Sequence, residues 1–430
     1  MKTKLSARFW LALTLFSLFG QVAWVVENMY LNVFIYKMFR ASTGDISLMV
    51  AASAITATLT TVLIGALSDR MGKRKVFICT GYILWGISVL GFALIRSDLV
   101  HNLFFPMVSF NGAALSLCIT LTITLDCVMT FFGSSANDAA FNAWLTDSTD
   151  ETNRGAAEGI NAMMPLVAIL VVFGGFMAFN LDDAESWSLI FTIIGSITLL
   201  VGVAGFFLIQ DSPAQPSQTG YWQNVIYSFR PSTIKANAGL YICLLLFILF
   251  NIAIQIFMPY LIIYYEVSLQ MKDYVLIMAP AIILASVATA FWGRVYDRKG
   301  FRFSAIIALI ALIVGFVVLY LFRDVALVFV GSLLMMCGYL CGMAVFGAKI
   351  RDLTPTGKAG MLQGVRIFSQ VLIPGVIGPY IGKAVLANAA TIENGDGTTS
   401  FIPNENIFLA ALIPAAIVLM TILLTRPKRK

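Results

Sequence analysis

Long apolar runs of roughly 20 residues recur along the whole 430-residue chain. Each run is long enough to cross a hydrocarbon core about 30 Å thick as an α-helix. Lipid offers the backbone no hydrogen bonds, so every amide in such a run must be satisfied within the protein, as it is in a helix. Only 12% of the residues are charged, about half the share of an ordinary soluble domain. The sequence therefore predicts an all-α membrane protein.

Short polar or charged segments separate the apolar runs and define twelve expected transmembrane helices. Their approximate limits are 9–37, 46–68, 75–95, 117–143, 159–180, 187–209, 238–265, 273–296, 302–322, 325–349, 361–387 and 404–425. The stretch 96–116 is the least regular, because Pro106 and Asn111 interrupt its apolar residues. It could extend the third or the fourth helix, or form a re-entrant outer segment.

One segment divides the chain into two halves. Residues 211–220 are rich in Pro, Ser and Gln, as linkers are. We therefore expect an N-terminal six-helix bundle at 1–209, a cytoplasmic linker at 210–237 and a C-terminal six-helix bundle at 238–430. The aromatic residues of 221–230 could lie along the membrane interface.

A charged loop occurs once in each half. It reads GALSDRMGKRK at 65–75 and GRVYDRKGFR at 293–302. Four residue types recur at an offset of 228: Gly65, Asp69, Arg70 and Gly72 return as Gly293, Asp297, Arg298 and Gly300. A loop repeated in this way indicates two similar membrane bundles joined in parallel.

This loop resembles the signature G-x-L-x-D-R-x-G-x-R-x between the second and third helices of the major facilitator superfamily. The resemblance covers the whole chain. It implies a fold of twelve transmembrane helices in two pseudo-symmetric six-helix bundles, and transport by alternating access.

The two loop copies are candidates for a cytoplasmic gate. Asp69 and Asp297 could pair with a basic residue, or with a helix N-terminus in the other half. Such a contact would hold the cytoplasmic side shut and be lost on opening. Alternatively, each loop is a solvated turn whose glycines permit tight geometry. The matched positions favour the gate, whose predicted residues are Gly65, Asp69, Arg70, Gly72, Arg74, Gly293, Asp297, Arg298, Gly300 and Arg302.

Lys and Arg gather at alternate ends of the apolar runs. This bias predicts a multi-pass protein of the cell membrane with both termini in the cytoplasm. The basic residues form no continuous face, so a nucleic-acid surface is not expected. His101 is the only histidine and the six cysteines form no CxxC pair, so we expect no metal site, no cofactor and no enzyme activity.

Polar residues within two equivalent spans suggest the walls of a cavity. In the first span Gln21, Trp24, Asn28 and Asn32 share a helix face, with Glu27 beside them. In the seventh span, Asn251, Gln255 and Pro259 form a similar stripe, with Tyr260, Tyr264 and Tyr265 further out. Polar and ionisable groups are costly inside a membrane, so their presence there suggests a function. Hydrogen bonding between packed helices is the alternative explanation.

The fourth span is the most polar. Asp126, Thr130, Ser134, Asn137, Phe141 and Trp144 share one face, and Asp138 lies one step round. Carboxylates that accept hydroxyl hydrogen bonds, together with an aromatic ring, suit a sugar. The run also resembles the fourth helix of the glycoside–pentoside–hexuronide:cation symporters, the melibiose permease group. That resemblance implies that Asp138 contacts the sugar.

The second span departs from that symporter group. Its members carry aspartates there that coordinate the coupling cation, whereas residues 46–68 contain threonines and no acid. Proton coupling through Glu27, Asp126 or Asp138 is the simpler hypothesis, because burial favours the protonated form of a carboxyl.

Arg366 lies about two turns into the eleventh span. A buried arginine needs an acid, and Asp138 or Glu27 could supply one across the cavity. Equally, its side chain could extend to the cytoplasmic surface and pair with Asp352 or Asp147.

These observations predict a secondary active transporter, a sugar or glycoside symporter coupled to a cation. Its partners would be a small polar solute, H⁺ and membrane lipid, and we expect a monomer. Efflux of amphipathic drugs is one alternative, because 33 Phe and 18 Met could line an apolar cavity. A lipid translocator or a non-transporting sensor is another. The predicted cavity residues are Glu27, Asn28, Asn32, Asp126, Asn137, Asp138, Trp144, Gln255, Tyr260 and Arg366.

Overall fold

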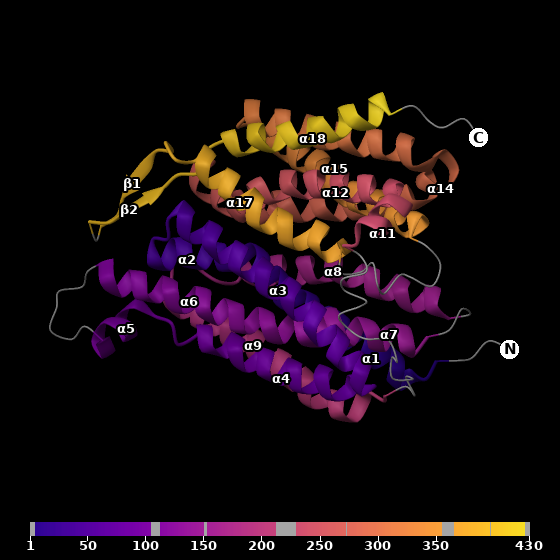
Figure 1. Cartoon of the computed structure of the whole chain (residues 1–430). Coiled ribbons are helices and arrows are strands. Elements are labelled where there is room, and N and C mark those ends of the chain that lie inside the picture. Colours follow the sequence, from indigo (N-terminus) through magenta and orange to yellow (C-terminus); the bar gives the residue numbers. More distant parts are fainter. Residues whose placement is uncertain are drawn as a thin grey trace. The chain divides into compact units, whose positions relative to one another are not determined.

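The computed structural model describes residues 5–104, 112–149, 153–211, 229–271, 273–354, 365–395 and 397–425. Within these ranges the chain is almost entirely helical (Figure 1). Eleven helical runs are long and apolar enough to cross a membrane. One of them, α14 (Tyr274–Leu321), is two helices joined at Gly300, whose φ of 77° and ψ of 175° are not helical. Counting it as two gives the twelve spans that the sequence predicts.

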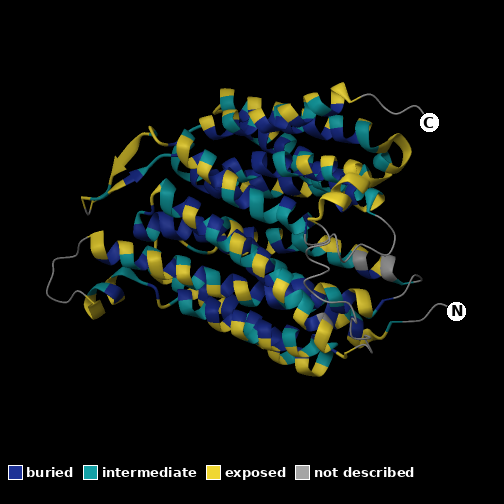
Figure 2. Cartoon of the chain, viewed as in Figure 1, coloured by how far each residue is buried: buried dark blue, intermediate teal, exposed yellow. Residues whose placement is uncertain are grey.

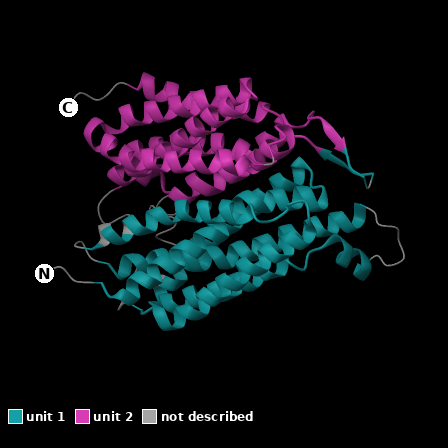
Figure 3. Cartoon of the chain, turned by 180° about the vertical axis from the view of Figure 1, so that it is seen from behind, with its two compact units in different colours: residues 1–221, 393–400 teal, residues 222–392, 401–430 magenta. Residues whose placement is uncertain are grey.

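The chain divides into two compact units (Figure 3). Unit 1 comprises residues 1–221 and 393–400, and unit 2 comprises 222–392 and 401–430. The described helical elements of unit 1 are α1 (Ala7–Val25), η1 (Val26–Tyr30), α2 (Leu31–Phe39), α3 (Thr43–Met71), α4 (Arg74–Phe92), α5 (Ser97–Phe104), α6 (Gly112–Gly133), η2 (Ser134–Phe141), α7 (Asn142–Asp147), α8 (Arg154–Phe176) and α9 (Ala184–Leu208).

Unit 2 repeats the helical pattern. Its described helical elements are α11 (Pro231–Ala236), α12 (Ala238–Phe257), η3 (Met258–Tyr260), α13 (Leu261–Ile263), η4 (Tyr264–Ser268), α14, α15 (Val325–Leu353), η5 (Phe368–Leu372), α17 (Ile373–Val385) and α18 (Asn406–Leu424). Two short strands, β1 (Thr391–Glu393) and β2 (Thr399–Phe401), form a hairpin before α18.

Glycines let one helix pair in each unit pack with their backbones in contact. A Cβ placed at Gly86 of α4 would lie 2.5 Å from the backbone nitrogen of Leu199 in α9. A Cβ at Gly315 of α14 would lie at the same distance from the backbone nitrogen of Met335 in α15. Small residues at helix contacts are typical of membrane bundles, where close packing replaces the hydrophobic effect between helices.

Outer helix faces carry exposed apolar residues, while the buried residues lie within each unit (Figure 2). Such faces suit lipid rather than water as the solvent. Examples are Leu189, Ile193, Leu200 and Phe207 on α9, and Leu409, Ile413, Ile417 and Met420 on α18.

The irregular stretch 96–116 contains a separate short helix, α5. It does not extend the third span, because α4 ends at Phe92 and a turn follows. The fourth span begins at Gly112, five residues before the predicted limit. The prediction of a re-entrant segment lies partly outside the described residues, as does the predicted interfacial segment 221–230. Residues 231–236 of the predicted linker form α11.

The second repeated glycine of each loop copy takes a positive φ. Gly72 ends α3 in the left-handed conformation, with φ of 63°. Gly300 has φ of 77°. Both values lie in the region where glycine is favoured because it has no Cβ. The repeated glycine therefore provides a sharp reversal between consecutive helices in both units.

Candidate functional site

Wider π-helical turns interrupt the first and fourth spans at the polar residues. Glu27 lies in η1, between α1 and α2. Asn137 and Asp138 lie in η2, between α6 and α7. A π turn holds one residue more than an α turn and is frequent at functional sites. In both spans the irregular turn places polar side chains inside unit 1.

The Glu27 carboxyl is buried and receives hydrogen bonds from two other helices. Ser53 of α3 donates its hydroxyl to Glu27 Oε1 at 2.6 Å. Thr130 of α6 donates to the same oxygen at 2.9 Å. The two hydroxyl oxygens lie 2.9 Å apart. The other carboxyl oxygen, Oε2, has no hydrogen-bond partner among the described residues, so it is available to hold a proton.

Two more carboxyls accompany Glu27. Asp126 lies one helical turn before Thr130, is 1% exposed, and has no partner for Oδ1 among the described residues. Both Asp126 and Asp138 interact electrostatically with Glu27. Ser134 donates its hydroxyl to Asp138 Oδ2 at 3.1 Å. None of the three forms an ion pair with a described residue. We call Glu27, Ser53, Asp126, Thr130, Ser134 and Asp138 the carboxyl cluster.

The neighbouring amides are arranged in two ways. Asn28 donates to the Trp24 carbonyl at 2.7 Å and Asn32 to the Asn28 carbonyl at 3.2 Å, so both amino groups bind their own helix. Asn137 is buried against Gly20 of α1, where a Cβ would overlap its amide. Its Nδ2 has no partner among the described residues. The Nδ2 of Asn137 therefore has both hydrogens free among the described residues, whereas the Nδ2 groups of Asn28 and Asn32 each use one hydrogen within their own helix.

Trp144 lies apart from the carboxyl cluster. Its indole nitrogen donates to the Gln210 carbonyl at 2.9 Å, and its ring stacks on Phe9 with centroids 5.1 Å apart. It is 2% exposed. These contacts describe a packed aromatic residue that joins α7 to α1 and to the end of α9.

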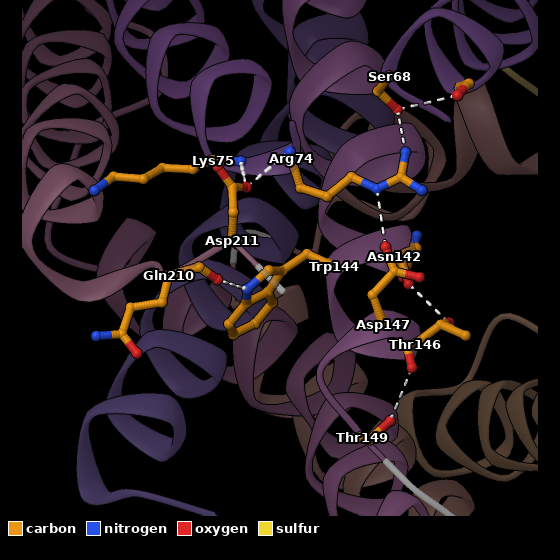
Figure 4. Close-up of polar contacts among 11 residues, drawn as sticks. Ser68, Arg74, Lys75, Asn142, Trp144, Thr146, Asp147, Thr149, Gln210 and Asp211 are labelled. Atoms are coloured by element: carbon orange, nitrogen blue, oxygen red, sulfur yellow. Dashed lines mark hydrogen bonds and ion pairs between the residues drawn. The ribbon is translucent and has the colours of Figure 1, made fainter. Parts of the chain in front are cut away.

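Residues 69–75 lie at one end of unit 1, which we call the loop end. Arg74 contacts other helices there (Figure 4). Its Nε lies 3.0 Å from Asp147 Oδ2, and its Nη1 donates to Ser68 Oγ at 2.6 Å. The backbone N–H groups of Arg74 and Lys75 donate to Asp211 Oδ1 at 2.9 and 2.8 Å. A carboxylate there also complements the positive end of the α4 dipole. Arg74 therefore fixes the loop within its own unit.

The remaining predicted gate residues are placed as follows. Arg302 donates to the Leu423 carbonyl at 2.7 Å. Arg70, Asp297 and Arg298 are exposed. The side chain of Asp69 lies outside the part of the chain that is described. A gate contact between the two halves stays a prediction.

The predicted residues of unit 2 lie in closely packed surroundings. Gln255 of α12 packs on Gly378 of α17, and Tyr260 packs on Gly382. Arg366 is half-buried and approaches Gly347 of α15. Of its predicted partners, Asp147 is paired with Arg74 and Asp352 accepts a hydrogen bond from Tyr296. Pairing of Arg366 with Glu27 or Asp138 in the other unit stays a prediction.

The sequence analysis missed three residues that complete these sites. Ser53 and Ser68 belong to the second predicted span, where serines show no distinctive pattern, and Asp211 lies in the predicted linker. Ser53 is found only through its contact with Glu27, 26 residues away. Asp211 contacts a loop 137 residues away. No local pattern signals contacts of this kind.

The family model of the Major Facilitator Superfamily matches residues 9–379. The chain belongs to this superfamily. Solved structures agree: a D-xylose-proton symporter has a TM-score of 0.74 at 13% identity, covering 98% of each chain. The nucleoside transporter NupG gives 0.68 at 14%, covering 97% of this chain and 99% of that one. A bacterial homolog of the human lysosomal transporter Spinster, inward-facing and unoccupied, gives 0.67 at 15%, covering 98% and 95%.

Identities this low show the fold alone. Comparison with curated proteins returned no match. The superfamily and the shared fold confirm the predicted architecture of twelve helices in two pseudo-symmetric six-helix bundles. Membership of this superfamily makes the protein a transporter.

Proposed function

We propose that the protein is a secondary active transporter that moves a small polar, sugar-like solute together with a proton. The observation that carries this proposal is the buried carboxyl cluster, in which Glu27 and Asp126 each leave an oxygen without a described partner. An ionisable group inside a membrane span is costly and usually functional. Because no described cation neutralises these carboxyls, a bound proton is the simplest way to do so.

Protonation would couple the carboxyls to alternating access. Each bound proton neutralises one carboxyl and so lowers the electrostatic cost of passing through a state closed to water. A solute that binds the protonated state more tightly would shift the population toward the loaded transporter. Transport of the proton would then be linked to transport of the solute.

We propose solute-binding groups in each unit. In unit 1, Asn28, Asn137 and Asp138 would offer amide and carboxyl groups. In unit 2, the proposed groups are Gln255 and Tyr260. A sugar-like solute fits this set, because its hydroxyls pair with amides and carboxylates. Two of the similar solved structures are named as a D-xylose-proton symporter and a nucleoside transporter, both acting on polar solutes.

We also propose the placement of the chain in the cell membrane. The Lys and Arg residues are concentrated at the loop end and at the corresponding ends of other spans, which favours a cytoplasmic position for that end and for both termini. In this proposal 210–237 connects the two bundles on the cytoplasmic side, and the protein works as a monomer.

A thermal-shift panel tests the proposal. Purified protein in detergent is heated with mono- and disaccharides, glycosides, nucleosides, hexuronates or amphipathic cations, each at two pH values with and without sodium. A ligand at 100 times its Kd stabilises the folded state by about 2.7 kcal/mol. We expect a saccharide or glycoside to raise the Tm in a pH-dependent and sodium-independent way.

The controls separate the carboxyl cluster from ordinary surface acids. Glu27→Gln should remove the pH dependence of the ligand-induced shift, whereas Glu185→Gln, at an exposed position of α9, should keep it. Stabilisation by amphipathic cations alone would replace the proposal with drug efflux. A panel without any stabilising solute would favour lipid movement or a sensor role.

A further inference from the structure

A polar residue occupies every fourth position from the middle of α6 to the end of α7. The six positions are Asp126, Thr130, Ser134, Asp138, Asn142 and Thr146. They extend over about 30 Å at a rise of 1.5 Å per residue. That length is comparable to the hydrocarbon core of a membrane. We call these six residues the polar stripe.

The π turn keeps the polar stripe on one side of the helix. In a regular α-helix, positions four apart rotate by about 40° at each step, so a long i, i+4 series spirals around the axis. In a π turn, four residues make less than one turn, so the rotation reverses. The turn η2 begins at Ser134, midway along the stripe, where this correction is needed.

Burial along the stripe falls steadily toward the loop end. Asp126, Thr130 and Ser134 are 1%, 0% and 0% exposed. Asp138 is partly exposed, and Asn142 and Thr146 are exposed. The stripe therefore connects a closed interior with an accessible helix end, close to Asp147.

Hydrogen bonds link the stripe to the carboxyls. Thr130 donates to Glu27 Oε1, and Ser134 donates to Asp138 Oδ2. Further along, Asn142 Nδ2 donates to the Asp138 carbonyl at 3.1 Å, and the Thr146 hydroxyl donates to the Asn142 carbonyl at 3.0 Å. A hydroxyl both donates and accepts, which is what a group that passes a proton along must do.

We propose that the polar stripe is the route by which protons reach and leave Glu27 and Asp126 from the loop end. The inference rests on the proton coupling proposed above and adds the hydroxyls of Thr130 and Ser134 to it as relay groups. Coupling then depends on two neutral side chains as well as on the carboxyls.

The transfer conserves protons at every step. The Asp138 carboxyl gives its proton to Ser134 Oγ, which releases its own proton toward Thr130, and Thr130 passes its proton to Glu27. Each hydroxyl gains one proton and loses one, so the net change is one proton moved from Asp138 to Glu27. The Cβ atoms of residues one turn apart are about 5–6 Å from each other, a separation that one bridging water can close.

The titratable groups of the elements packed around the stripe are as follows. From α4, Tyr82 interacts with Asp138 and donates its hydroxyl to the Phe16 carbonyl. From α2, Lys37 pairs with Asp182, and beside α5, Asp98 pairs with Arg96. At the loop end Arg74 pairs with Asp147. Glu27 comes from η1 and Ser53 from α3, and Cys127 of α6 interacts electrostatically with Asp126 and Glu27.

Infrared spectroscopy tests the route without any solute. A protonated carboxyl has a C=O stretching band that shifts when its proton is exchanged for deuterium, so transfer into D₂O buffer reports how fast protons reach the cluster. Glu27→Gln and Asp126→Asn assign the bands by removing them. Thr130→Val and Ser134→Ala should slow the exchange by about tenfold or more, equivalent to about 1.4 kcal/mol on the barrier.

Matched variants make the outcome decisive. Thr122→Val is the control, because Thr122 is equally buried on α6 and donates to the Cys118 carbonyl of its own helix. It should exchange like the wild type. Thr130→Ser keeps the hydroxyl and should restore fast exchange even if Thr130→Val lowers the Tm.

Two results would overturn the route. One is exchange in Thr130→Val and Ser134→Ala as fast as in Thr122→Val. The other is the absence of any protonated-carboxyl band that Glu27→Gln or Asp126→Asn removes. Failure of the solute panel, by contrast, would remove the proposed function while leaving these spectra unchanged.

Discussion

Asp147 in unit 1 and Asp352 in unit 2 occupy corresponding positions in a repeat with an offset of 205 residues, yet different side chains satisfy them. Asp147 pairs with Arg74, which also binds Ser68. Asp352 accepts a hydrogen bond from Tyr296, which replaces Ser68 in the repeat. The counterpart of Arg74, Arg302, binds a carbonyl instead. The aspartate therefore pairs with a buried arginine in one unit and with a neutral tyrosine hydroxyl in the other.

A parallel difference exists deep in the spans. Unit 1 buries the carboxyls of Glu27 and Asp126. Among the described residues of unit 2, the buried polar side chains are uncharged: Thr233, Asn251, Tyr260, Tyr264, Tyr265, Tyr274, Ser304, Ser332 and Ser369. Pseudo-symmetry of the backbone therefore does not require symmetry of charge. Under our proposal unit 1 handles the proton, and unit 2 contributes neutral groups to the solute.

The largest expected effect comes from removing the two buried carboxyls of unit 1. We expect the double variant Glu27→Gln, Asp126→Asn to reduce solute accumulation driven by a pH gradient by about 100-fold or more, or about 2.7 kcal/mol, because only the partly exposed Asp138 carboxyl of the cluster then remains. Asn251→Leu in unit 2 should leave the pH dependence intact. Uptake into proteoliposomes, with the solute identified by thermal shift, measures both effects. Accumulation by the double variant at the wild-type level would show that proton coupling does not depend on Glu27 and Asp126.

Breaking the aspartate contacts should destabilise the units unequally. Asp147→Ala leaves the Arg74 side chain, only 8% exposed, without its anion, and we expect a loss of about 3 kcal/mol. Asp352→Ala removes a hydrogen bond from a more exposed pair and should lose about 1 kcal/mol. Thermal unfolding in detergent measures both. Equal losses of stability in the two variants would show that the two contacts stabilise the protein equally.

Each unit contains a close glycine contact between two helices. We therefore expect substitution of either glycine to destabilise the protein to the same extent. Gly86→Ala and Gly315→Ala each bring a Cβ to 2.5 Å from a backbone nitrogen, so we expect each to destabilise by about 2 kcal/mol through overpacking. Gly174→Ala in α8 is the matched control, since nothing lies within 4 Å of its Cβ position. A marked difference between the first two variants in the same unfolding assay would show that one helix pair can spread apart.

The smallest effect concerns two adjacent tyrosines of unit 2. The Tyr265 hydroxyl lies 2.5 Å from Ser332 Oγ, whereas the buried Tyr264 hydroxyl has no partner among the described residues. Tyr265→Phe should lose about 1 kcal/mol of stability. Tyr264→Phe should change stability by less than about 0.5 kcal/mol. A larger loss of stability in Tyr264→Phe than in Tyr265→Phe would reverse this assignment.

The sequence predicted the spans well because their length and hydropathy are local properties. Glu27 and Asp126, which are conspicuous in the sequence because acids are costly in a membrane, are buried in unit 1, while the cavity role of these residues and of Asp138 stays a prediction. Trp144 shows the limit of face patterns: its stacking partner, Phe9, lies 135 positions earlier in the chain. The π turns cannot be predicted from the sequence, because no residue pattern distinguishes them from an α-helix. Ser53 and Asp211 became visible only through long-range contacts.

The most direct test of proton coupling is solute-dependent proton movement in proteoliposomes that contain a pH-sensitive dye. Adding the identified solute outside, without an imposed gradient, should acidify the interior of vesicles containing the wild type or the exposed-site control Glu185→Gln. Vesicles containing the Glu27→Gln, Asp126→Asn variant should not acidify, although solute exchange across their membrane continues. Solute entry into wild-type vesicles without any change in internal pH would contradict proton coupling through the carboxyl cluster.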